Sequence, residues 1–64
     1  MEWAKELVGK SFEEAEAIAT TMGYVIRPTV VDGQPIGVTT DFRTDRLNVS
    51  ITNNIVDYVD ERVG

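Results

Sequence analysis

Residues 11–31 read SFEEAEAIATTMGYVIRPTVV, and this stretch decides the fold because a helical pattern passes directly into a strand-like one. Ser11 and Glu14 have the spacing of a capping box, in which the Ser11 hydroxyl accepts the N–H of Glu14 and the Glu14 carboxylate reaches back to the N–H of Ser11. Apolar residues then recur at helical spacing on one face, namely Phe12, Ala15, Ile18, Ala19 and Met22. Gly23 can adopt the left-handed conformation that ends a helix. The pattern therefore predicts a helix over residues 12–22.

Strand patterns fill much of the remaining chain. Residues 24–31 are rich in β-branched side chains, and Pro28 within them cannot donate a ladder hydrogen bond, so we expect it beside an edge or a bulge. Residues 47–52 alternate apolar and polar, which is the period of a half-buried strand. The pair Asn53-Asn54 is a plausible tight turn because Asn tolerates positive φ. Residues 55–59 then form the second strand of a hairpin.

The order helix, strand, long loop, strand, strand predicts the α+β class. A parallel pairing of the strands at 24–31 and 47–52 needs a crossover connection, and residues 32–45 are long enough to supply it. A loop of that length in so small a domain is generally functional or disordered, and this one is not disordered by composition. We expect one domain over residues 1–64, with a single helix packed on a small mixed β-sheet and a long exposed loop.

The composition excludes several classes of function. A chain of 64 residues buries only about 60% of its unfolded surface, which leaves no room for a deep cleft that excludes water and counts against an enzyme. The absence of His and Cys removes the commonest general base, the thiolate nucleophile and the usual zinc ligands, and it rules out a disulfide. We therefore expect no catalytic residues, no metal and no cofactor.

The charge and hydropathy of the chain limit the classes of partner that it can bind. Eleven acidic and six basic residues give a net charge of −5, the wrong sign for binding nucleic acid. No apolar run approaches the roughly 20 residues of a membrane span. Residues 1–3 show no basic region or apolar core of a signal peptide, so the protein is either cytoplasmic or secreted after removal of a signal. We expect a monomer.

Three motifs, in order along the chain, resemble the potato inhibitor I family of serine protease inhibitors. The first is Trp3 followed by residues 6–15, ELVGKSFEEA. The second is residues 38–46, VTTDFRTDR, which is similar to the reactive loop of that family and the start of the strand behind it. The third is residues 62–64, RVG. Each motif alone is weak evidence for the resemblance, but the three together cover most of the chain.

The resemblance implies a serine protease inhibitor that presents its loop as a substrate would, with the scissile bond between Thr40 and Asp41. The residues implied to contact the protease are Val38, Thr39, Thr40, Asp41, Phe42 and Arg43. The implied partner is a subtilisin-, elastase- or chymotrypsin-like protease, and Thr40 favours the first two because it is small and β-branched. Arg46 matches one of two arginines that support the loop in the family, and it could bond Thr39 and the carboxylate of Asp41. The second supporting position holds Asn48.

Other interpretations of these residues stay open at this point. The same fold could serve as a non-inhibitory interaction module, whose loop binds another protein or nothing. Arg46 could be a surface arginine paired with Asp45 or with the terminal carboxylate of Gly64. Asp41 and Asp45 could suggest metal or acid–base chemistry, but they form no dense carboxylate cluster.

Overall fold

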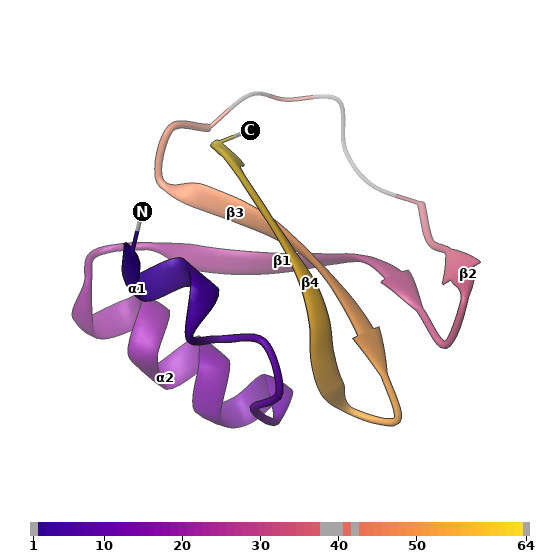
Figure 1. The fold of residues 1–64 in the computed structure, drawn as a ribbon. Coiled ribbons are helices and arrows are strands. Elements are labelled where there is room, and N and C mark those ends of the chain that lie inside the picture. The colour runs from indigo at the N-terminus through magenta and orange to yellow at the C-terminus, as the bar shows by residue number, and fades with distance from the viewer. Residues whose placement is uncertain (1, 38–40, 42, 64) are drawn as a thin grey trace.

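Figure 1 shows the computed structural model, which describes residues 2–37, 41 and 43–63. One main helix packs on a four-stranded mixed sheet, so the predicted α+β class is confirmed. The elements in chain order are α1 (Glu2–Lys5), α2 (Phe12–Thr21), β1 (Val25–Val31), β2 (Gln34–Pro35), β3 (Arg46–Thr52) and β4 (Ile55–Val63). The sequence patterns did not predict α1 or β2, and β4 is longer than the predicted strand. Within the described residues, no helix is both long and apolar enough to cross a membrane.

Both ends of α2 follow their local sequence. The Ser11 hydroxyl accepts the N–H of Glu14 at 3.2 Å, as predicted. The other half of the capping box differs, because the Glu14 carboxylate accepts from the Ser11 hydroxyl, at 3.5 Å, in place of the Ser11 N–H. The N–H groups of Gly23 and Tyr24 donate to the carbonyl oxygens of Thr20 and Ala19, a Schellman ending that requires the φ of +82° found at Gly23.

The sheet has the strand order β2-β1-β3-β4, and β1 and β3 are parallel as predicted. The other two pairings are antiparallel. The register of β1 against β3 shifts between Pro28 and Val30, so Pro28 lies beside a bulge, where its missing N–H breaks no regular ladder. The sequence expectation for this proline is confirmed.

Two tight turns shape the sheet. Asn53 and Asn54 have φ values of 51° and 65° and join β3 to β4, as their sequence predicts. Asp32 and Gly33, at 52° and 79°, form a similar two-residue turn between β1 and β2. Residues 32–37 were predicted as loop only, although Asp-Gly between two strands is a strong hairpin signal. Part of the expected long loop is therefore a short hairpin.

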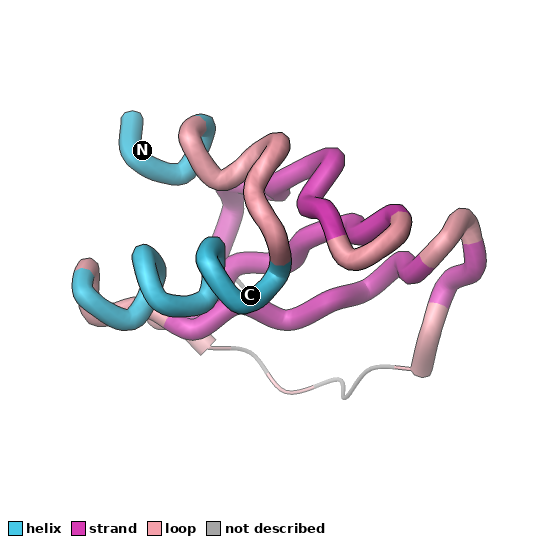
Figure 2. Tube along the Cα trace, turned by 90° about the horizontal axis from the view of Figure 1, so that it is seen from below, coloured by secondary structure: helices cyan, strands magenta, loops and turns pink. Residues whose placement is uncertain are grey.

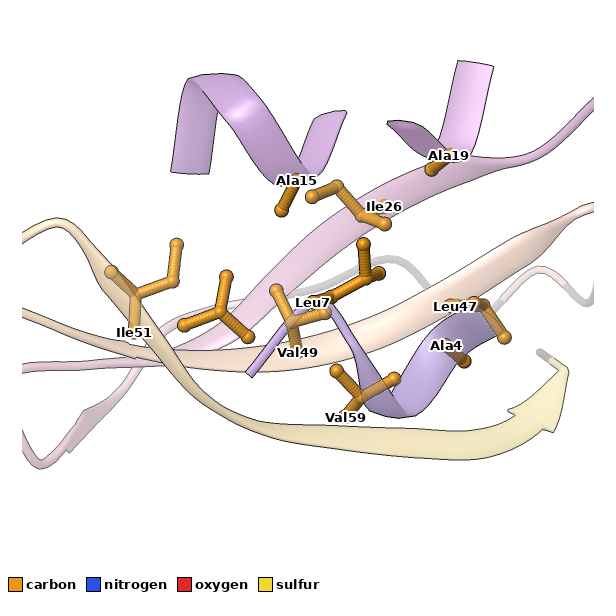
Figure 3. Close-up of a cluster of buried hydrophobic side chains, with 10 residues drawn as sticks. Ala4, Leu7, Ala15, Ala19, Ile26, Leu47, Val49, Ile51 and Val59 are labelled. Carbon is orange, nitrogen blue, oxygen red and sulfur yellow. The ribbon is translucent and has the colours of Figure 1, made fainter. Parts of the chain in front are cut away.

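The core lies between the sheet and the helices (Figure 3). Ala15 and Ala19 of α2 are fully buried, and their small side chains let the helix approach the sheet closely. The largest fully buried side chains are Leu7, Leu47, Val49 and Val56. Val49 and Ile51 of β3 are buried, whereas Trp3, Phe12 and Ile18 are partly buried and pack against the cluster. Met22 was predicted on the apolar helix face but is 48% exposed, because the helix ends before it.

The segment before α2 runs along the start of β4. The Gly9 N–H donates to the Val56 carbonyl oxygen at 2.8 Å, and the Val56 N–H donates to the Lys10 carbonyl oxygen at 2.9 Å. These bonds satisfy backbone groups of an otherwise open strand edge. Figure 2 shows this segment and α1 at one side of the strands.

Candidate functional site

The sheet has two different faces, and the candidate site lies on the face opposite α2, called the open face below. Side chains alternate along a strand, and Leu47 and Val49 of β3 point into the core. Arg46 and Asn48 therefore project from the open face. Arg27 of β1 is paired in register with Asn48 and lies on the same face. The described parts of the connection from β2 to β3 lie on the other side of the sheet from α2 (Figure 1).

Arg46 is the residue that ties this connection to the sheet. Its Nη2 donates to the backbone oxygen of Asp41 at 3.0 Å, and its Nη1 donates to the Asp41 carboxylate at 3.3 Å. Arg46 is 7% exposed, whereas the Asp41 side chain is 52% exposed. No buried side-chain nitrogen or oxygen in the described part of the chain lacks a hydrogen-bond partner. The predicted bond from Arg46 to the carboxylate of Asp41 is thus present.

Asn48 occupies the second expected support position. Its side-chain oxygen accepts a hydrogen bond of 3.0 Å from Nε of Arg27. Both residues are half-buried. Sequence reasoning missed Arg27, because its relation to Asn48 depends on the register between two strands that are far apart in the chain. The only available signal was the predicted parallel pairing of those strands.

Arg43 and Asp45 form a second ion pair close to the first. Nε and Nη2 of Arg43 donate to the two carboxylate oxygens of Asp45 at 2.9 and 2.7 Å. This hydrogen bonding holds the pKa of Asp45 below its ordinary value of 3.8. Both side chains are about half exposed to solvent. The alternative in which Asp45 pairs with Arg46 is not the arrangement found, because Asp45 bonds Arg43 and Arg46 bonds Asp41.

A further polar cluster lies at the other end of β3. The Thr52 hydroxyl donates to the Asp57 carboxylate at 2.6 Å, and Ser50 also hydrogen-bonds this carboxylate. Together these bonds lower the pKa of Asp57 from its ordinary value of 3.8. Asp32 accepts the N–H of Asn53 at 2.8 Å and so joins the two tight turns. These contacts act within the fold and show no arrangement for catalysis.

The remaining predicted site residues, Val38, Thr39, Thr40 and Phe42, lie outside the described residues. The protease-binding role of the loop thus stays a prediction. The contact expected between Arg46 and Thr39 lies outside them as well. Among the described residues, no group of three or more His, Cys, Asp or Glu side chains is placed to hold a metal ion.

No family model matches this chain, and no curated protein matches it. The resemblance to the potato inhibitor I family therefore rests on the three sequence motifs alone.

Proposed function

We propose that this protein is a serine protease inhibitor that presents residues 38–43 to a protease as a substrate-like loop, with the scissile bond between Thr40 and Asp41. The observation that supports this proposal is the pair of hydrogen bonds from buried Arg46 to Asp41. One bond goes to the backbone oxygen and the other to the side chain. Residue 41 is thereby anchored to the rigid sheet directly after the proposed scissile bond.

The anchor matters because substrate-like inhibition depends on the rigidity of the loop that enters the protease. A flexible peptide loses conformational entropy when it enters a protease cleft, whereas a loop already held in its bound shape loses less. More of the contact free energy then appears as affinity. The loop would add main-chain hydrogen bonds to the protease as an extended strand does.

The same anchor would also act after cleavage of the loop. If the protease cuts between Thr40 and Asp41, the new amino terminus belongs to Asp41. The bonds from Arg46 to the Asp41 carboxylate and backbone oxygen do not involve the broken peptide bond. The cleaved end would therefore stay near the protease active site, where the peptide bond can form again. Slow and reversible cleavage is the expected kinetic behaviour.

The residue proposed for the primary specificity pocket is Thr40. Its side chain is small and β-branched, so it fits a small or tolerant pocket better than one that selects a large aromatic group. We propose subtilisin-like and elastase-like proteases as the first targets, and chymotrypsin-like enzymes as weaker ones.

The test is a titration of the protein against subtilisin, elastase, chymotrypsin and trypsin, with mass spectrometry of each mixture. Tight inhibition together with slow cleavage at Thr40–Asp41 is the expected result. The variant Arg46→Ala should weaken inhibition and accelerate cleavage. Lys5→Ala is the matched control, because it removes one exposed positive charge from α1 and leaves the open face intact.

Two results would contradict the proposal. Rapid cleavage within residues 38–43 without inhibition would show that the loop is an ordinary substrate. An absence of both cleavage and inhibition with every protease of the panel would favour the non-inhibitory interaction module.

A further inference from the structure

The chain that leads from the proposed scissile bond into β3 balances its own charges. Residues 41–46 contain two acidic and two basic side chains, so this segment has no net charge in a chain whose total is −5. Arg46 pairs with Asp41, and Arg43 pairs with Asp45 at 2.7 Å. Both partners of the second pair are about half exposed. Exposed ion pairs contribute little to stability, so stability alone does not account for the pair of Arg43 and Asp45.

Asp45 is the fixed partner of this pair. Its backbone oxygen accepts the Val25 N–H of β1 at 2.8 Å. The next residue, Arg46, is in register with Val25 at the start of the parallel ladder. The chain turns at Thr44 and Asp45 before it enters β3, and the Asp45 carboxylate bonds the side chain of Arg43 only two positions earlier. This carboxylate therefore projects from a backbone that the sheet holds in place.

The two hydrogen bonds use one edge of the Arg43 guanidinium group. Nε and Nη2 donate to the two carboxylate oxygens of Asp45 at 2.9 and 2.7 Å. Such a bidentate pair fixes the plane of the guanidinium group as well as its position. A guanidinium group has five N–H donors, and the bonds to Asp45 do not use those of Nη1. The Arg43 side chain is 48% exposed, so a partner can reach it.

We propose that Asp45 is a positioning residue that orients the Arg43 guanidinium group toward the protease, where Nη1 donates to an oxygen acceptor. Arg43 is the third residue after the proposed scissile bond, so this acceptor lies on the side of the cleft that binds the leaving part of the loop. A side chain that is ordered before binding loses less entropy in the complex. The contact with the protease rests on the proposed function, whereas the orientation of Arg43 by Asp45 in the free protein does not.

The first experiment measures the free protein and needs no protease. The order parameter of the Arg43 Nε–H group is obtained from ¹⁵N relaxation, with the buried Arg46 as reference. It should be high in the unaltered protein and fall clearly in Asp45→Asn, which replaces one acceptor oxygen with an NH₂ donor. The Arg46 value should stay constant. A low Arg43 value in the unaltered protein, or one that Asp45→Asn leaves unchanged, would overturn the inference.

Asp57→Asn is the matched control for this substitution. It also removes an exposed carboxylate that accepts a side-chain hydrogen bond, and Asp57 lies near the other end of β3. The order parameter of Arg43 should therefore stay at the value of the unaltered protein. An equal fall of this order parameter in Asp45→Asn and Asp57→Asn would show a general effect of lost carboxylates and would contradict the role of Asp45.

The second experiment measures inhibition of the protease that the unaltered protein inhibits most tightly. Arg43→Ala should raise the inhibition constant by about tenfold or more, because a charge-assisted hydrogen bond to the protease is lost. Asp45→Asn should raise it by about threefold to tenfold, because binding must then order the Arg43 side chain. The variant that combines them should match Arg43→Ala alone, since Asp45 acts through Arg43. Losses that add in the combined variant would show a structural role of Asp45 and would overturn the inference.

The two experiments separate this inference from the proposed function. If the unaltered protein inhibits no protease but Asp45→Asn mobilises the Arg43 side chain, the proposed function fails and the orientation of Arg43 by Asp45 stands. If the unaltered protein inhibits and Asp45→Asn matches it in both experiments, only the role of Asp45 fails.

Discussion

Arg46 reaches Asp41 through two contacts of different kinds, one to the backbone oxygen at 3.0 Å and one to the carboxylate at 3.3 Å. Only the second contact depends on the side chain of Asp41. That carboxylate is about half exposed, whereas Arg46 is buried. The backbone contact is also the shorter of the two, so we expect it to contribute more to holding residue 41.

This difference predicts unequal effects of two substitutions. Asp41→Asn removes the charge of a carboxylate that is half exposed and keeps an oxygen acceptor, so it should cost about 0–1 kcal/mol of binding free energy to a protease. Arg46→Ala removes both contacts and should cost about 1.5–3 kcal/mol or more, since a charged hydrogen bond is lost. The inhibition constants of Asp41→Asn, Arg46→Ala and the variant that combines them measure the contribution of each contact. Equal losses in the two single variants would show that the carboxylate, and not the backbone oxygen, is the main anchor.

The second prediction concerns acid stability. The folded-state pKa values of Asp45 and Asp57 are lowered, so each carboxylate contributes stability that is fully present above its unfolded pKa and is lost as pH falls through the lower folded pKa. The contribution of these two groups to the free energy of unfolding should thus be constant near neutral pH and should decrease from about pH 4 downward. Urea titrations between pH 2 and 7 measure this dependence.

Amide variants identify the source of the acid dependence. Asp45→Asn and Asp57→Asn each remove one titrating carboxylate, so each should reduce the slope of stability against pH below pH 4. The two carboxylates belong to separate clusters, with Arg43 at one and Thr52 at the other, so the two reductions should add. An unaltered slope in both variants would show that other carboxylates cause the loss of stability in acid.

The third prediction concerns the core. Leu47 is fully buried beneath the helices, and Leu47→Ala should reduce the free energy of unfolding by about 2–5 kcal/mol because it leaves a cavity. Val8 is 48% exposed, and Val8→Ala should change stability by no more than about 0.5 kcal/mol. Thermal and urea unfolding of the two variants provide the comparison. A loss of less than about 1 kcal/mol for Leu47→Ala would mean that the core can collapse around the missing side chain.

Local sequence signals accounted for much of the fold. The helix was predictable because Ser11 and Gly23 act on backbone groups within three or four residues of themselves. The turn at Asn53 and Asn54 was predictable for the same reason. The short helix α1 was missed because four residues are too few to show a period. The strand β2 was missed because its two residues show no alternation, although Asp32-Gly33 carried the hairpin signal.

The candidate site was less predictable because it is made by pairing between distant strands. The contact of Arg46 with Asp41 spans five positions and was expected from the resemblance. The bond from Arg27 to Asn48 spans 21 positions and depends on the exact register of β1 against β3. A shift of that register by one residue would place Arg27 opposite a core position. Sequence patterns locate strands but do not determine register to one residue.

The last prediction concerns the contact between the two tight turns. Asp32 has a φ of 52°, and its carboxylate accepts the N–H of Asn53 at 2.8 Å. Asp32→Asn keeps an oxygen acceptor and a side chain that tolerates positive φ, so its stability should be close to that of the unaltered protein. Asp32→Ala loses the acceptor and places a Cβ without polar compensation in the left-handed region. Asp32→Ala should therefore reduce the free energy of unfolding by about 1–3 kcal/mol.

Thermal unfolding of these two variants checks the prediction. A loss of about 1 kcal/mol lowers the melting temperature by about 4–8 °C in a domain of this size. Asp32→Ala should therefore melt clearly below Asp32→Asn. Equal melting temperatures would mean that water replaces the carboxylate at the Asn53 N–H and that the turn adopts another conformation without cost. Because this turn leads into β2 and then into the chain toward Asp41, Asp32→Ala should also lower the order parameter of the Ile36 amide, which donates to the Thr29 carbonyl oxygen across the hairpin.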